Sequence, residues 1–311
     1  MSAFALSPAK IASLVYEVCE LDVRAFKPGN VSLQSPGHRM TAADFIKSAE
    51  AVTRPLSLPG LSVGERILFA IRSTHAAVGC NTNLGIVLLL APLAQAALLE
   101  TDEADLGVRV ERVLASLTND DAALAFEAIR VAAPAGLGAS QRLDVNSAPT
   151  GTLLEAMREA QDRDQIARQY ATNYRGVLDT AAPLARAALE RWQSHEWATV
   201  AVYLHWLATV PDTHVERKFS RVVAERVRKQ AVALDVQFQA ASSPDALRQQ
   251  LQSFDQELKH GGINPGTSAD LTVASLMAMH LQEHYRQQVN DRLADEATGY
   301  YPQRASARAF H

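Results

Sequence analysis

Apolar residues recur at helical spacing along almost the whole chain. Intervals of three and four residues place them on one face of a helix, whereas no convincing run of alternating β-branched residues competes with this pattern. The pattern therefore predicts an all-α fold of roughly a dozen helices. Representative positions are Ile11, Leu14, Val15 and Val18, then Ile67, Ala70 and Ile71, then Val200, Tyr203, Leu204 and Leu207.

Glycine, proline and short polar clusters divide this helical pattern into segments of ordinary length. We expect one compact helical domain over residues 1–299, followed by a polar tail at 300–311. The stretch 134–151 is rich in Gly, Ala and Ser, and we interpret it as a functional loop because polar segments lie on both sides of it. The breaks fall at 27–38, 55–64, 79–83, 134–151, 211–213, 242–244 and 261–266.

Composition describes an ordinary globular protein that can bury a sizeable core, with 311 residues of which 48% are hydrophobic. The formal net charge of -4 argues against a nucleic-acid partner, because no global basic field is present. Cys19 and Cys80 have no paired spacing, so we expect two reduced, mostly buried thiols in a cytoplasmic protein. Small-molecule partners are expected, and a homodimer is compatible with the sequence.

No membrane or secretory segment is predicted. The most apolar stretch, from Ile86 to Leu99, contains Pro92 and Gln95 and falls short of the ~20 residues that span a bilayer. It is therefore expected to be a buried core helix. The N-terminal region carries acidic residues in its first helical pattern and lacks an uninterrupted apolar core, unlike a signal peptide.

Four short polar segments stand where helices are predicted to begin or end. They cover residues 27–30, 81–85, 211–218 and 264–270. Helix ends carry unsatisfied backbone N–H groups and partial charges, and these bind phosphate readily. Together the four polar segments indicate a site for a polyphosphate ligand.

Helix capping explains part of these patterns. Thr41, Thr213 and Thr267 each precede an acidic residue by three positions, which is the spacing of a capping box. Any one of them taken singly is best interpreted as a cap, worth about 1 kcal/mol without any ligand.

The third polar segment contains more charge than capping requires. Asp212 and Glu216 lie beside Arg217 and Lys218 at one predicted helix start. Carboxylates can hold Mg²⁺ while cations and the helix N-terminus bind phosphate oxygens. This mixture suits a metal-bound phosphate, although a solvated charged face would look similar.

The first two polar segments also contain polar residues that a turn alone does not require. Pro28 and Gly29 explain a turn, but they do not explain the lysine and asparagine that flank them. Amides that enter the most hydrophobic helix would be buried, and a ligand is one partner they could find. The residues in question are Lys27, Asn30, Asn81, Thr82 and Asn83.

His280 and His284 match the zinc pattern H-x-x-E-H. Their polar surroundings, and the short tail that follows them, favour an exposed helix face over a zinc site. We likewise interpret His75, His195 and His205 as packed or surface residues.

Taken in order, these residues resemble the triphosphoribosyl-dephospho-CoA synthase family, over most of the chain. The sequence looks closest to a divergent branch found in archaea and methylotrophic bacteria, where members are linked with tetrahydromethanopterin-dependent one-carbon metabolism. The resemblance rests on Glu20, Lys27-Pro28-Gly29, His38 and Met40 with Phe45 and Ser48, Asn81-Thr82 and Gly85, Asp212-Thr213 with Arg217, Leu247-Arg248, Phe254-Asp255 and residues 265–271.

The resemblance implies an all-helical, Mg²⁺-dependent transferase. Such an enzyme moves the 5-triphosphoribosyl group of ATP to the 2′-hydroxyl of dephospho-CoA and releases adenine. It implies Asp212, Asp270, Glu216 and Glu20 as catalytic residues, of which the first three also bind metal. It implies nucleotide contacts from Lys27, Asn30, His38, Asn81, Thr82, Asn83, Arg217, Lys218, Thr267 and Ser268.

The sequence departs from the synthase pattern at Asn83-Leu84, where the synthases typically have histidine and lysine. Two alternatives therefore stay open. The same donor could serve another acceptor in tetrahydromethanopterin-linked metabolism, or the chain could be a non-catalytic helical nucleotide-binding protein.

Overall fold

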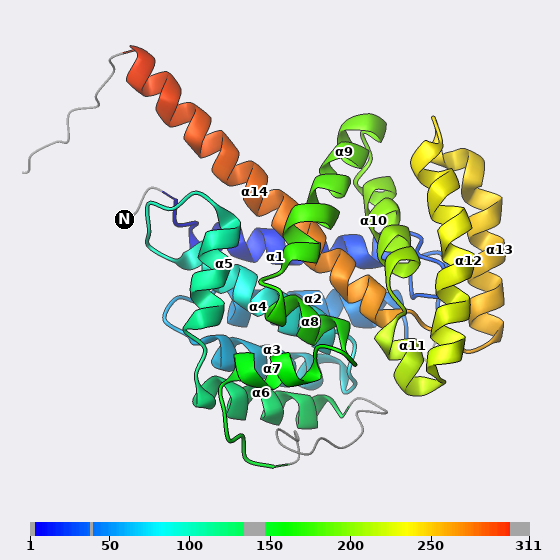
Figure 1. The fold of residues 1–311 in the computed structure, drawn as a ribbon, viewed down its shortest axis with the longest axis horizontal. Coiled ribbons are helices and arrows are strands. Elements are labelled where there is room, and N and C mark those ends of the chain that lie inside the picture. Colours follow the sequence, from blue (N-terminus) through cyan, green and yellow to red (C-terminus); the bar gives the residue numbers. More distant parts are fainter. Residues whose placement is uncertain (1–3, 38–39, 134–146, 299–311) are drawn as a thin grey trace, which may run out of the picture.

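A computed structural model describes residues 4–37, 40–133 and 147–298, which form fourteen α-helices and no β-strand (Figure 1). The predicted all-α fold is confirmed. The helices are α1 (Pro8–Arg24), α2 (Ala42–Ser57), α3 (Val63–Val78), α4 (Leu84–Leu98), α5 (Leu106–Ala115), α6 (Asn119–Ala132), α7 (Leu153–Ala160), α8 (Gln165–Ala171), α9 (Ala182–Trp192), α10 (His195–Thr209), α11 (Thr213–Lys218), α12 (Arg221–Ala240), α13 (Arg248–His260) and α14 (Gly266–Thr298). A π-helical turn (Gly176–Ala181) precedes α9, and a 3₁₀ turn (Pro244–Leu247) precedes α13.

The buried apolar side chains form two clusters. The larger one lies among α1 to α8 and α14, and the smaller one among α10, α12 and α13. Figure 1 shows α12 and α13 side by side at one end of the molecule, while α14 runs through its middle. Helix α14 contributes to both clusters and thereby connects them.

Helix α4 is the buried core helix that the sequence predicts, and it contains a proline. Pro92 has no N–H group, so the carbonyl oxygen of Leu88 cannot receive its usual intrahelical hydrogen bond. The hydroxyl of Tyr170 donates to that oxygen at 2.5 Å, and Tyr174 donates to the oxygen of Leu89 at 3.1 Å. Side chains from the α8 region thus complete the backbone hydrogen bonding of α4.

A buried arginine satisfies the last carbonyl groups of the same helix. Arg109 on α5 has no exposed surface. It donates to the backbone oxygens of Ala96, Leu99 and Glu103 at 2.8, 2.7 and 2.7 Å. The guanidinium therefore caps the C-terminal end of α4 and holds α5 against it.

Arg66 on α3 plays the same part for α2. It donates to the backbone oxygens of Leu56 and Leu58 at 2.9 and 2.7 Å. Burial lowers the pKa of Arg66 to about 10. The backbone oxygens at the C-terminal ends of two helices thus accept hydrogen bonds from arginine side chains of neighbouring helices.

The capping predictions were right at one site and wrong at two. Thr41 forms the expected capping box, since Asp44 Oδ2 accepts the Thr41 N–H at 2.8 Å. Helix α11 begins at Thr213 with Asp212 as its N-cap, so Thr213 is not the cap. Helix α14 begins at Gly266, so Thr267 lies inside its first turn.

Several predictions fall on residues that the structure does not describe. These are the nucleotide contact at His38, most of the expected loop at 134–151, and the tail at 300–311. Both cysteines are free, but only Cys19 is buried and Cys80 is exposed. Among the described helices, none combines the length and apolar character needed to cross a bilayer.

Replacing Arg109 by methionine should lower the free energy of unfolding by about 3 kcal/mol or more. The change removes the charged donor from three backbone oxygens, of which those of Ala96 and Leu99 keep only one backbone N–H each, at 3.4 and 3.1 Å. A hydrogen bond from a charged group contributes about 1.5–3 kcal/mol. Urea unfolding measured by circular dichroism would detect this loss. The matched control is Arg112→Met, which removes an exposed hydrogen bond to Thr101 and should change stability by less than about 0.5 kcal/mol. Equal stability of the two variants would contradict a capping role for Arg109.

Candidate functional site

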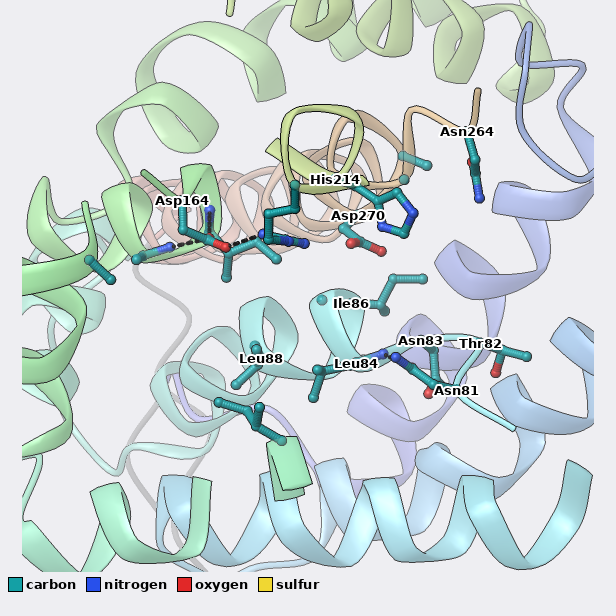
Figure 2. Close-up of a pocket in the computed structure, with 18 of the residues that line it drawn as sticks. Asn81, Thr82, Asn83, Leu84, Ile86, Leu88, Asp164, His214, Asn264 and Asp270 are labelled. Atoms are coloured by element: carbon teal, nitrogen blue, oxygen red, sulfur yellow. Dashed lines mark hydrogen bonds and ion pairs between the residues drawn. The ribbon is translucent and has the colours of Figure 1, made fainter. Parts of the chain in front are cut away.

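The four polar segments meet in one pocket with a volume of about 600 Å³. Its walls come from α1, α4, α7 and α8 and from the first turns of α11 and α14. Figure 2 shows Asp270 and His214 on one side of the pocket, across from Asn81, Thr82 and Asn83. The segments contribute Asn30, residues 81–85, then His214, Glu216 and Arg217, and finally Asn264, Gly266, Ala269 and Asp270.

Asp212 holds two helix starts together at the edge of this pocket. Its side chain is almost completely buried, with 1% exposure. Oδ1 accepts the N–H of Val215 in α11 at 3.0 Å, and Oδ2 accepts the N–H and the hydroxyl of Ser268 in α14 at 2.7 and 2.8 Å. One carboxylate thus caps α11 and also binds the first turn of α14.

The hydroxyl groups of this region strengthen the same junction. Thr267 Oγ1 accepts the N–H of His214 at 3.1 Å and lies 3.1 Å from Thr213 Oγ1. Asp212, Thr267 and Ser268 are not among the residues that line the pocket within the described chain. They position the two helices from behind the pocket wall.

Asp270 projects from the first turn of α14 toward the start of α4. Contact is so close that a Cβ atom on Gly85 would lie 2.0 Å from Asp270 Oδ2, so the position requires glycine. Burial raises the pKa of Asp270 well above its usual range, and the nearby charges of Asp22 and Asp212 raise it further. In the ligand-free protein this carboxyl therefore favours a proton or a cation.

Lys27, the expected phosphate contact, is engaged elsewhere. It is completely buried, and its Nζ lies 3.0 Å from Asp22 Oδ1 and also contacts the backbone oxygen of Asp22. Asp22 itself lines the pocket. Lys27 thus compensates the charge of a pocket carboxylate from behind.

Arg217 lies on the pocket wall, whereas Lys218 does not. Arg217 Nη1 donates to Asp164 Oδ2 at 2.6 Å, and its buried Nε has no hydrogen-bond partner. Asp164 in turn caps α8, since its Oδ1 accepts the N–H of Ile166 at 2.8 Å. Lys218 donates to the backbone oxygen of Gly262 at 3.2 Å on the exposed side.

Amide side chains with unused hydrogen-bonding atoms also line the pocket. Asn30 donates to Asn264 at 2.9 Å, but its own Oδ1 is buried without a partner. Asn83 Oδ1 is likewise buried and unpartnered. Asn81 accepts the N–H of Leu84 at 3.1 Å. Since buried polar atoms need partners, these positions are suited to a polar ligand.

The predicted acidic residues are divided between the pocket and its surroundings. Glu216 lines the pocket and lies 3.5 Å from Arg221, whereas Glu20 pairs with Arg24 at 3.5 Å and is not a lining residue. Across the described residues, the carboxylates of Asp212, Glu216 and Asp270 do not form a preassembled three-ligand metal cluster. The metal assignment of all three thus stays a prediction.

The structure also adds pocket residues to which the sequence interpretation gave no role in the site: Asp22, Asp164 and His214. Asn264 belongs to the fourth polar segment and also lines the pocket. A signal existed for Asp22, because it continues the apolar face formed by Val15 and Val18 at helical spacing. An acid on a buried stripe is unusual. His214 lies between Thr213 and Glu216, whose spacing was interpreted as a capping box, so it was not considered as a site residue.

Residues 8–289 match the sequence model of the family CitG, described as ATP:dephospho-CoA triphosphoribosyl transferase. This match confirms the resemblance inferred from the polar segments. Among solved structures, the chain is similar to a proposed triphosphoribosyl-dephospho-CoA synthase from Archaeoglobus fulgidus, with a TM-score of 0.57 and 22% sequence identity. The alignment covers 77% of this chain and 98% of the other. No curated protein matches the sequence.

Replacing Asp270 by asparagine should raise the melting temperature of the ligand-free protein near pH 8. The folded-state pKa of Asp270 is raised, so its stabilising contribution is full below the unfolded pKa of about 3.9 and is lost as pH rises through the folded pKa. Asparagine cannot ionise, so the advantage of the variant should shrink as pH falls. Thermal unfolding followed over several pH values in a chelating buffer measures this trend.

Asp212→Asn is the matched control and should have the opposite effect. An amide cannot accept all three hydrogen bonds that the carboxylate receives, and the loss is expected to be about 1–3 kcal/mol. If Asp270→Asn destabilised the protein at pH 8 as Asp212→Asn does, Asp270 would have a structural role instead.

Proposed function

We propose that this chain, which belongs to the ATP:dephospho-CoA triphosphoribosyl transferase family, moves the 5-triphosphoribosyl group of ATP to an acceptor hydroxyl and releases adenine. The observation that carries the proposal is Asp270, a carboxyl with a raised pKa in the pocket where all four polar segments meet. A volume of about 600 Å³ suits a small-molecule site, for which about 300–1,000 Å³ is typical.

We assign the triphosphate to the part of the pocket between the first turns of α4 and α14, where Gly85 and Asp270 face each other. Backbone N–H groups at helix N-termini favour anions, and both first turns contribute lining residues. Arg217 adds a cation with a free Nε donor beside them. Arg217 is thus the phosphate contact we retain from the expected set, together with the amide of Asn30.

The pocket residues fit Mg²⁺ bound with ATP. Mg²⁺ prefers oxygen ligands and is commonly held by one or two carboxylates together with substrate phosphates. Asp270 and Asp22 supply such oxygens at the pocket surface, while both oxygens of Asp212 already accept hydrogen bonds. When bound, Mg²⁺ would neutralise charge on the triphosphate and on these two carboxylates.

The transfer breaks the bond between C1′ of the ATP ribose and the adenine nitrogen, and it forms a bond from the acceptor oxygen to C1′. Adenine leaves with the electron pair and takes up a proton, while the acceptor hydroxyl loses one. Positive charge develops at C1′, and the carboxylate of Glu216 on the pocket wall can stabilise it. We assign the proton transfer to His214, which faces the pocket beside Asp270 (Figure 2).

The remaining wall is apolar and suits the flat adenine ring. Leu88, Phe126, Ile129 and Met157 lie on this side. Residues 81–83 provide amide and hydroxyl groups at its border, where they can orient the base or the ribose. A pocket with an apolar part and a few placed polar groups matches the general design of nucleotide sites.

The acceptor is dephospho-CoA in the family, and a different acceptor is the second candidate. Leu84 lines the pocket at the position where the synthase pattern has lysine, so this wall offers no cation there. A changed acceptor, such as a precursor in tetrahydromethanopterin-linked one-carbon metabolism, would be consistent with that difference.

Purified protein mixed with ATP, Mg²⁺ and dephospho-CoA should release free adenine, which chromatography quantifies. Asp270→Asn should lower kcat by about 100-fold, as is typical when one preorganised electrostatic group is removed. The matched control Asp179→Asn changes an exposed aspartate that is not part of the pocket lining and should leave kcat unchanged.

Adenine that appears only with a pterin-pathway or arylamine acceptor would support the second candidate. If a folded protein released no adenine with either acceptor but melted at a higher temperature with ATP, it would be a non-catalytic nucleotide-binding protein. The proposed transferase activity would then be refuted.

Gly85→Ala should strongly reduce adenine release because the new methyl group would occupy the place of Asp270 Oδ2. The expected loss in kcat/KM is about 100-fold or more, similar to removal of the carboxylate. Gly261→Ala is the control, since this glycine is not part of the pocket lining and the nearest atom to its Cβ would be the flexible end of Ile263 at 3.3 Å. The same activity assay applies, and full activity of Gly85→Ala would show that Asp270 can move without consequence.

A further inference from the structure

Three potential metal ligands from three helices meet outside the pocket. They are Glu17 on α1, His195 at the start of α10 and His280 on α14. One ligand atom from each lies within 4.8 Å of the other two, and no other such trio occurs among the described residues. The imidazole rings of His195 and His280 are stacked, with centroids 6.0 Å apart and an angle of 15° between their planes.

His280 has a buried ring nitrogen, Nε2, with no hydrogen-bond partner. Burial lowers the pKa of His280, and the nearby His195 and Lys10 lower it further, although Glu17 opposes them. A metal binds the neutral form of an imidazole through its unprotonated ring nitrogen. A buried nitrogen without a partner is costly unless a ligand occupies it.

We propose that Glu17, His195 and His280 bind a zinc ion that no catalytic step of the transfer requires. Two imidazole nitrogens and one carboxylate oxygen form a donor set that zinc accepts, whereas Mg²⁺ prefers oxygen ligands alone. In a tetrahedral site with bonds of about 2.0–2.2 Å, ligand atoms lie about 3.3–3.5 Å apart. Small side-chain rotations would bring the three ligands from their present separations to these values. His195 is partly exposed, so water can occupy the fourth position.

The site is separate from the nucleotide pocket. None of its three ligands lines that pocket. His280 follows Asp270 by ten positions in α14, which corresponds to about 15 Å along a helix. Most buried apolar residues of α10 belong to the smaller core cluster, whereas those of α1 and α14 belong mainly to the larger one. The ion would therefore cross-link the two clusters.

The pattern H-x-x-E-H pointed to His280 but to the wrong partners. His284 lies one turn further along α14 and is not part of the trio. His280 instead meets residues that are distant in sequence, which the spacing within one helix cannot reveal. His284 is consequently a matched control on the same helix.

Untagged full-length protein, freed of metal by a chelator and dialysed, should bind one equivalent of Zn²⁺ in calorimetric titration. Co²⁺ in place of zinc should give the visible absorption of a tetrahedral site. His195→Ala and His280→Ala should each raise the Kd for Zn²⁺ by more than about 100-fold, because loss of outer-shell partners alone costs about 10–100-fold. His284→Ala and Asp270→Asn should leave the Kd unchanged.

Zn²⁺ should also raise the melting temperature of the wild-type protein, since it binds only the folded state. His195 is partly exposed and its replacement is compatible with folding, so this variant keeps the test decisive if His280→Ala unfolds. The proposal is overturned if wild type binds no stoichiometric zinc, if His195→Ala retains wild-type affinity, or if Asp270→Asn abolishes binding, which would place the ion in the nucleotide pocket.

Discussion

The carboxylate of Asp212 accepts hydrogen bonds from the first turns of α11 and α14, and the shape of the pocket depends on this junction. Two helices that are far apart in sequence begin side by side because they share one acceptor. Their shared origin sets His214 and Arg217 next to Asp270 on the pocket wall. Backbone N–H groups at a buried helix start are costly when they have no hydrogen-bond acceptor. By accepting N–H groups from both helices, Asp212 also fixes the positions of the pocket side chains that these helices carry.

Several carboxylates lie close together in this region, and their mutual repulsion lowers the stability of the folded protein. Asp270 has a raised pKa because it is buried near other carboxylates, and Lys27 compensates only Asp22. Such a site is less stable without a ligand than it would be with neutral side chains. Binding of a cationic or metal-bearing ligand relieves the repulsion between these carboxylates. The ligand-free protein is therefore less stable, and the ligand binds more tightly, as is common at functional sites.

Helical periodicity predicted the all-α fold and the buried helix α4, because both depend on patterns within a dozen residues. The convergence of the four polar segments could also be inferred, since each contained more charge or amide groups than its local turn required. The exact caps at Thr213 and Thr267 could not. Asp212 caps α11 through the N–H of Val215 in place of Thr213, and its other oxygen binds Ser268 in the first turn of α14, 56 residues away. Lys27 is buried beside Asp22 in the ligand-free protein, so its expected phosphate contact stays a prediction. Its partner, Asp22, is close in sequence, but only burial decides whether a lysine meets a ligand or an acid.

The proline in α4 has a consequence for the order in which the protein acquires its structure. The backbone oxygen of Leu88 receives its hydrogen bond from the hydroxyl of Tyr170, which lies 82 residues later in the chain. While the protein is being synthesised, α4 is finished long before Tyr170 leaves the ribosome. The central helix of the larger core is therefore left with an incomplete backbone until a distant segment docks. Maturation of this core is thus tied to the emergence of the second half of the chain, which makes N-terminal fragments poor independent folding units.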